Sequence, residues 1–94
     1  MTLKDFKSTL SSSAPPAVSE TLKAMWFDGK GDWEQAHNVA QDIHTLEGSW
    51  IHAYLHRKEG DAGNAAYWYS RARQPVCKSS FEEEWNAIVA ALLG

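Results

Sequence analysis

The sequence predicts an all-α protein built as two stacked antiparallel helical hairpins with a C-terminal closing helix. The first observation is a repeated phrase, a Gly-Asp pair with an alanine four residues after the aspartate, at residues 31–36 and 60–65. The two copies lie 29 positions apart, and a period of that size is typical of stacked structural repeats. The second observation is that apolar residues elsewhere recur at helical spacing, whereas no segment alternates as a strand would.

The composition limits the classes of function. A chain of 94 residues suits one domain. The formal net charge is −3, whereas a general nucleic-acid binder carries a strong basic excess, so we expect no nucleic-acid partner. No apolar stretch approaches the ~20 residues needed to cross a bilayer, so we expect no membrane partner. The single cysteine, Cys77, fits a reducing compartment, and the start of the chain lacks an apolar leader, which favours a cytoplasmic location.

Residues 1–16 are predicted to form a short helix followed by a linker. Thr2 is a suitable N-cap, and Leu3 and Phe6 fall on one face of a helix that reaches about Leu10. Serines and a Pro-Pro pair then stop the helix and favour extended backbone. We therefore expect this first segment either to pack back on the rest of the chain or to stay disordered.

Residues 17–75 are predicted to hold the two hairpins. In the first hairpin, a helix from about Ala17 to Asp28 ends at a glycine-rich turn. Asp32 then caps a second helix that runs to about Ile43. The turn is short, so the two helices are expected to pack antiparallel.

The second hairpin repeats this plan. Its first helix runs from about Glu47 to Glu59 and ends at Gly60, and Asp61 caps a helix that stops before Pro75. The first of these helices has an apolar arc made of Trp50, Ile51, Tyr54 and Leu55. The second is expected to turn inward the small and aromatic residues Ala62, Ala65, Trp68, Tyr69 and Ala72.

Residues 79–93 are predicted to form the closing helix. Ser79 and Ser80 are each followed three residues later by a glutamate, which gives two overlapping capping boxes. Three acidic residues, 82–84, favour the positive end of the helix dipole. The apolar stripe expected to pack on the hairpins consists of Phe81, Trp85, Ile88, Val89 and Leu92.

Small and aromatic residues follow the second Gly-Asp turn in a recognisable order. The positions concerned are Ala65, Tyr69 and Ala72 after the turn, and Ala53 before it. In this order the segment from about Ser19 to Pro75 resembles tetratricopeptide-type repeats and their Sel1-like relatives. The resemblance implies a scaffold for protein contacts, with a concave face lined mainly by the first helix of each hairpin.

The first copy of the phrase matches the family pattern less well. Ala24 and Ala36 stand at the positions of small residues, but Ala40 and Ile43 occupy those of an aromatic and a small residue. The spacing of 29 is also shorter than the usual period of about 34.

The leading hypothesis for function is a non-enzymatic protein–protein interaction module that binds a protein partner or a second copy of itself. The hairpin repeat favours it, and no segment carries a specific catalytic or cofactor motif. Cys77 has no partner that the sequence identifies as a base, and the acids 82–84 are explained as helix-start charges. We therefore expect no enzymatic activity and no cofactor.

The alternative hypothesis is a small-molecule or metal-binding protein, conceivably an enzyme, with a His/Tyr/Arg surface pocket. His52 and His56 are four positions apart, which places both imidazoles on one helix face. That face lies opposite the apolar arc, so we interpret it as solvated surface, with a metal site as the other possibility. His37 and His44 share the edge of the preceding helix and are interpreted as boundary residues. Bringing all four to one metal would need two helices that face each other through their polar sides.

A polar-aromatic set completes this alternative. Asn64, Tyr67 and Arg71 share the polar face of one helix. With His52, His56 and Arg57 from the neighbouring helix, they could bind a carboxylate or phosphate. The other interpretation is a surface network that stiffens the hairpin.

Overall fold

The computed structural model describes residues 1–94 and confirms the all-α class. The elements are α1 (Leu3–Ser8), a short 3₁₀ turn η1 (Thr9–Ser11), α2 (Glu20–Gly29), α3 (Trp33–Ala40), α4 (Leu46–Lys58), α5 (Ala62–Ala72) and α6 (Phe81–Leu93). There is no strand, and no helix has the length and apolar character that crossing a bilayer would require.

Local capping signals set where each helix begins. The side chains of Thr2, Asp32, Asp61 and Ser80 each accept a hydrogen bond from a backbone N–H of the first turn, as the sequence predicted. Helix α2 begins at Glu20 rather than near residue 17, because Ser19 is its cap. Helix α3 ends at Ala40, about one turn before the predicted end. The glycines of the two repeated turns, Gly31 and Gly60, have positive φ angles of 83° and 90°, which a side chain would disfavour.

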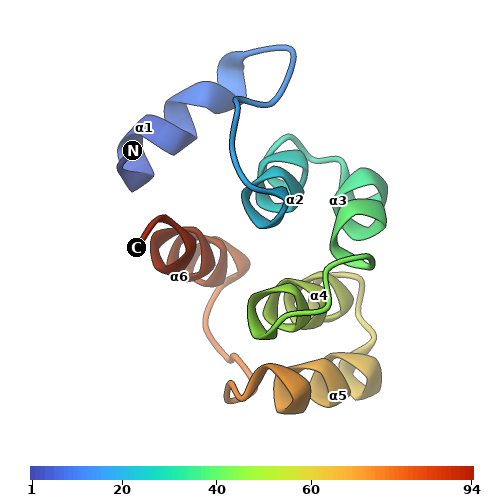
Figure 1. Cartoon of the computed structure of the whole chain (residues 1–94). Helices are drawn as coiled ribbons and strands as arrows, with labels where there is room; N and C mark the ends of the chain where they lie inside the picture. Colours follow the sequence, from blue (N-terminus) through green and yellow to red (C-terminus); the bar gives the residue numbers. More distant parts are fainter.

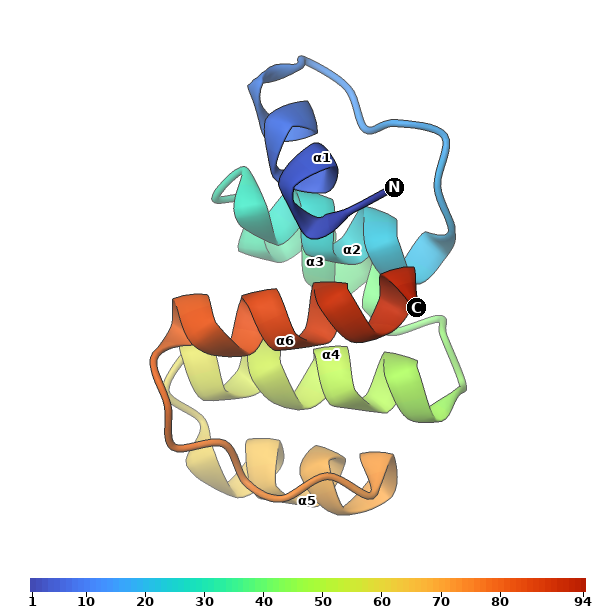
Figure 2. The same cartoon turned by 90° about the vertical axis from the view of Figure 1, so that its left-hand side faces the viewer.

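The helices pack as two hairpins and a cover. Helix α2 packs on α3, and α4 packs on α5 (Figure 1). Helix α6 lies across α4 and α2, the first helix of each hairpin, and α1 packs on α6 (Figure 2). The face that the tetratricopeptide resemblance assigns to protein contacts is therefore covered by the chain's own last helix.

Apolar burial follows most of the predicted stripes. One continuous core joins α1, α2, α3, α4 and α6, and its largest members include Phe6, Met25, Trp26, Ile51, Tyr54, Leu55, Trp85 and Ile88. Phe81 and Ala62 are exceptions. Phe81 is 42 % exposed and lies under the guanidinium of Arg57, and Ala62 is also exposed. The prediction that these two residues face the core is wrong, because each is the first residue of its helix and lies at the end of the buried stripe.

Two buried carboxylates tie neighbouring helices to α4. Asp28 of α2 accepts hydrogen bonds from the Tyr54 hydroxyl at 2.6 Å and from Lys58 Nζ at 3.0 Å. Burial, followed by the hydrogen bond to Asp28, raises the pKa of Tyr54, so the hydroxyl remains a donor. Both partners of Asp28 come from one face of α4, which fixes α2 against it.

The second carboxylate, Glu84 of α6, lies in the first turn as a helix-start charge, as predicted, and it is also buried. It accepts hydrogen bonds from the Tyr69 hydroxyl at 2.6 Å, from Arg57 Nη1 at 2.9 Å and from Trp50 Nε1 at 3.3 Å. Arg57 also donates to the carbonyl of Ser79. Donors from α4 and α5 thus converge on one acid of α6 and hold three helices together.

Replacing Glu84 tests this network. We expect Glu84→Ala to lower the free energy of unfolding by roughly 3–5 kcal/mol, because it leaves the half-buried Arg57 and the buried Tyr69 hydroxyl without their shared partner. Urea denaturation followed by circular dichroism measures the change. The matched variant Glu82→Ala removes an exposed acid of the same turn and should change stability by under about 0.5 kcal/mol. Equal stability of the two variants would contradict this role for Glu84.

Candidate functional site

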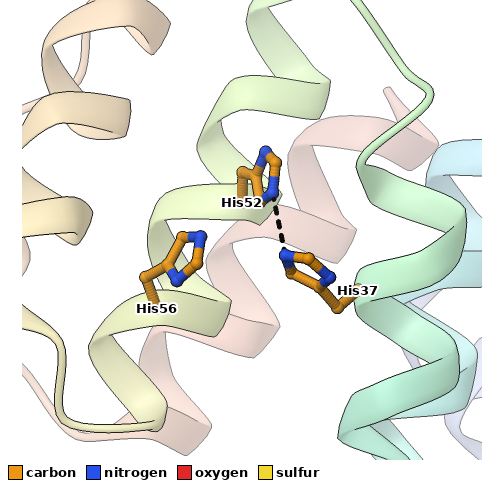
Figure 3. A group of neighbouring side chains, drawn as sticks. All are labelled: His37, His52 and His56. Atoms are coloured by element: carbon orange, nitrogen blue, oxygen red, sulfur yellow. Dashed lines mark hydrogen bonds between the residues drawn. The ribbon is translucent and has the colours of Figure 1, made fainter.

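Three histidines from two helices meet between α3 and α4. His37 projects from α3, and His52 and His56 project from α4 (Figure 3). Nε2 of His37 lies 3.1 Å from Nε2 of His52. One nitrogen from each of the three rings can be chosen so that all lie within 4.8 Å of one another. We refer to His37, His52 and His56 as the histidine cluster.

The structure overturns the prediction that His52 and His56 lie on solvated surface. Each is only 8 % exposed. The helical-wheel argument placed them correctly, opposite the apolar arc of α4, but α4 is a central helix. Helix α3 covers its polar face from one side and α5 from the other, so that face is an interior between the two hairpins. His37, which was interpreted as a boundary residue, faces the same interior.

Aromatic rings enclose the cluster. The Trp33 indole stacks on the His37 ring at a centroid distance of 5.0 Å, and its Nε1–H donates to the Leu55 carbonyl at 2.8 Å. The centroid of the Trp68 ring of α5 lies 4.1 Å from the centroid of the His52 ring. These contacts restrict the orientation of two imidazoles and limit the access of water to them.

The electrostatic environment keeps two of the imidazoles neutral. Burial, followed by the neighbouring His37 and His56, lowers the pKa of His52 to about 4. Burial is also the main cause that lowers the pKa of His37, with a further contribution from His56 and a partial offset by Glu59. A neutral imidazole has a lone pair, so near neutral pH both residues are in the state that binds a metal.

His56 is oriented by a carboxylate. Its Nδ1 lies 2.6 Å from Oε1 of Glu59, one turn later on the chain. In proteins that bind metal through histidine, such a contact at one ring nitrogen holds the proton there and leaves the other nitrogen as the ligand. The carboxylate of Asp61 is also near His56, but it caps α5 by accepting from the Asn64 N–H.

The spacing of the cluster fits a tetrahedral metal. Two nitrogens bound to one zinc ion at about 2.0–2.1 Å lie roughly 3.3 Å apart. The separation of 3.1 Å between the Nε2 atoms of His37 and His52 is close to this value. His56 would have to approach by small side-chain rotations, since the cluster nitrogens lie within 4.8 Å. Three imidazoles would then leave a fourth coordination position.

A cavity of about 480 Å³ lies on the other side of His52. It opens between the α3–α4 turn, the start of α4 and the end of α5, and its lining includes Ile43, His44, Leu46, His52, Trp68 and Arg71. The guanidinium of Arg71 is held over the Trp68 ring at 5.4 Å and donates to the Tyr67 hydroxyl at 3.0 Å.

The six predicted binding residues are divided among four places. His52 and His56 belong to the histidine cluster, and Arg71, with Tyr67 beside it, borders the adjoining cavity. Arg57 lies apart from them, because it points to α6 and pairs with Glu84. Asn64 is exposed in the first turn of α5. Its backbone N–H donates to the Asp61 carboxylate. His44 borders the cavity but lies outside the cluster.

Sequence reasoning missed His37, Trp33 and Trp68 as members of one site. A signal was present, because His37 and Trp33 are four positions apart and share a face of α3. Pairing that face with the histidine face of α4 needed the knowledge that α3 and α4 pack through these sides, which periodicity alone does not supply.

Comparison with protein-family models, with curated proteins and with solved structures finds no match to this chain. The resemblance to tetratricopeptide-type and Sel1-like hairpins therefore stays a prediction.

The burial of His52 predicts an acid-sensitive fold. Its pKa is about 4 in the folded chain and about 6.5 when unfolded. Between these values the unfolded chain binds more protons, so stability is full above about pH 6.5 and falls as the pH drops towards 4. His37, His56 and Arg71 around the ring offer no negative charge that would offset protonation.

The measurement is the melting temperature of the chelator-treated chain between about pH 7.5 and about pH 4.5. This range crosses the histidine pKa of about 6.5 in the unfolded chain. We expect His52→Gln to flatten the pH dependence, because the variant has no group to protonate there. His44→Gln, which removes an exposed imidazole, should leave the profile unchanged. A wild-type profile that is identical to that of His52→Gln would contradict the assignment.

Proposed function

We propose that the protein binds a divalent transition metal ion through His37, His52 and His56. The observation that carries this proposal is the convergence of three imidazoles, with one nitrogen of each within 4.8 Å of the others, at a largely buried point between two hairpins. The three imidazoles make side-chain hydrogen bonds only with one another and with Glu59, so their lone pairs are available to a metal ion.

The donor set determines the kind of metal. Neutral imidazole nitrogen suits zinc, copper, nickel and cobalt, whereas calcium and magnesium prefer oxygen ligands. A site with three histidines leaves one position for water or a substrate atom, which is the arrangement of catalytic rather than structural zinc sites. The cluster would therefore be able to present a metal-bound water or to hold a ligand that coordinates through one atom.

Titration with zinc(II) and cobalt(II) tests the proposal. We expect one metal per chain, a visible spectrum typical of four-coordinate cobalt, and a higher melting temperature. At a free metal concentration of 100 times the dissociation constant, the added stability is roughly 2.7 kcal/mol. His37→Gln, His52→Gln and His56→Gln should each weaken binding by about tenfold or more, because each removes one of three ligands.

Two variants sharpen the test. Glu59→Gln should weaken binding by roughly 10–100-fold, since it removes the carboxylate that orients His56. His44→Gln removes a histidine outside the cluster and should bind as the wild type does. Absence of saturable binding in the wild type, or equal loss in His44→Gln, would refute the proposal.

The second candidate function is the non-enzymatic interaction module that binds a protein partner or a second copy. An apolar groove of about 230 Å³ favours it, at the junction of α4, α5 and α6. The groove lining includes Leu46, Trp50, Ala72, Ala91 and Leu92, and Leu46 is 47 % exposed. Helix α6 covers the first helices of the hairpins, so this groove takes the place of the concave face that the family resemblance implies.

Affinity capture with a charged variant tests this candidate. Leu46→Glu places an acid in the first turn of α4, where the helix dipole tolerates it, and so should preserve the fold. We expect the wild-type bait to retain a protein, or a second copy of the chain in sedimentation, that Leu46→Glu loses. If both baits retain the same proteins and both chains sediment as monomers, the groove is not an interaction surface.

A further inference from the structure

The cavity beside His52 is directly connected to the histidine cluster. His52 is the only member of the cluster that lines it, and the His52 ring forms part of the wall between the two. Figure 3 shows that Nε2 of His52 points at His37, whereas the other ring nitrogen, Nδ1, points along α4 towards its N-terminal end. That end of α4, with the α3–α4 turn, contributes most of the cavity lining.

A metal at Nε2 of His52 determines what Nδ1 can do. A neutral imidazole has one proton, and coordination through Nε2 requires that this proton be on Nδ1. In the metal-free chain the proton can instead lie between the Nε2 atoms of His37 and His52, which are 3.1 Å apart. Metal binding therefore makes Nδ1 a hydrogen-bond donor directed towards the cavity, and the metal's positive charge makes that donor stronger.

A second donor, Arg71, lines the same cavity. The guanidinium of Arg71 is stacked over Trp68 and bonded to the Tyr67 hydroxyl through Nη1 only. Its remaining N–H groups have no protein partner and can pair with a carboxylate in a bidentate manner. Trp68 contacts both donors, since its ring also packs on His52 at 4.1 Å.

The rest of the wall is apolar on one part and polar on another. Ile43, Leu46 and the Trp68 ring give the apolar surface on which a ligand body can pack, and the other lining residues are Gln41, His44, Thr45 and Ser49. No acidic side chain is among the lining residues. The volume of about 480 Å³ lies within the range of about 300–1,000 Å³ that is usual for small-molecule sites. One guanidinium and one imidazole N–H match a single carboxylate better than a phosphate dianion.

We infer that the cavity binds a small carboxylic acid with an apolar body, whose carboxylate accepts hydrogen bonds from Arg71 and from Nδ1 of metal-bound His52. The inference rests on the proposed metal function, since the metal fixes the Nδ1 proton. The acid and the metal then bind cooperatively, because each favours the same tautomer of one imidazole.

Benzoate is the probe, and the zinc-loaded chain is the sample. Isothermal titration should give saturable binding of benzoate to the zinc-loaded wild type, and weaker binding to the chelator-treated chain. Benzamide, which has the same shape but no charge, should bind roughly tenfold more weakly or not at all, because it loses the charge-assisted pair with Arg71.

Matched arginine variants complete the experiment. Arg71→Gln should lose about tenfold or more in benzoate affinity and keep the zinc affinity of the wild type. Arg73→Gln removes an exposed arginine of the same helix end that does not line the cavity, and should bind both as the wild type does. The zinc titration reports on the proposed function and the benzoate titration on the cavity, so the two failures are distinguishable.

Two outcomes would overturn the inference. The first is that zinc binds to the wild type but benzoate does not. The same conclusion follows if the zinc-loaded wild type binds benzamide as tightly as benzoate, or if Arg71→Gln binds benzoate as tightly as the wild type does. In these cases the cavity is not a carboxylate site and the metal site stands. If zinc does not bind to the wild type, the metal function and the cooperative acid site are both refuted.

Discussion

Helix α4 is enclosed on nearly every side, and the rest of the structure depends on this constraint. Helices α2, α3, α5 and α6 all pack against it. Its buried residues are Gly48, Ser49, Ile51, His52, Ala53, Tyr54, Leu55 and His56. A helix that carries polar side chains into such surroundings must satisfy them inside the protein. Its polar partners on three of these helices are Asp28 on α2, His37 on α3 and Glu84 on α6. Tyr69 of α5 joins this set by donating to Glu84.

The buried polar groups around α4 differ in how many hydrogen-bond partners they have, and this difference indicates which of them have a purely structural role. Asp28 and Glu84 each accept from a tyrosine hydroxyl and a cationic side chain, so each acid has a complete set of donors. They have stabilising roles that need no ligand. In the histidine cluster, His37 and His52 have only each other through a single shared proton. This pairing is looser than the sets of donors around Asp28 and Glu84, and it is the feature on which the proposed metal function rests.

Local structure was predictable from the sequence, whereas the surroundings of α4 were not. Capping residues such as Asp61 and Ser80 act on the N–H groups of their own first turn, so their effect can be inferred from neighbours in the chain. The burial of Glu84 and His52 depends instead on helices brought from elsewhere. Helical periodicity placed His52 opposite the apolar arc but gave no sign that α3 and α5 cover that side. For the same reason, Arg57 was grouped with the histidines, although one residue of separation from His56 turns it towards α6.

The cover formed by α6 has a consequence for how the chain folds. The two hairpins can form from contacts that are close in the sequence, but the Trp85 indole donates to the Met25 carbonyl across 60 positions. During synthesis the N-terminal segments emerge first. The apolar sides of α2 and α4 therefore stay uncovered until the last helix has left the ribosome. The entropically costly step is the closure of this long loop, and the histidine cluster lies on α3 and α4, which precede α6 in the chain.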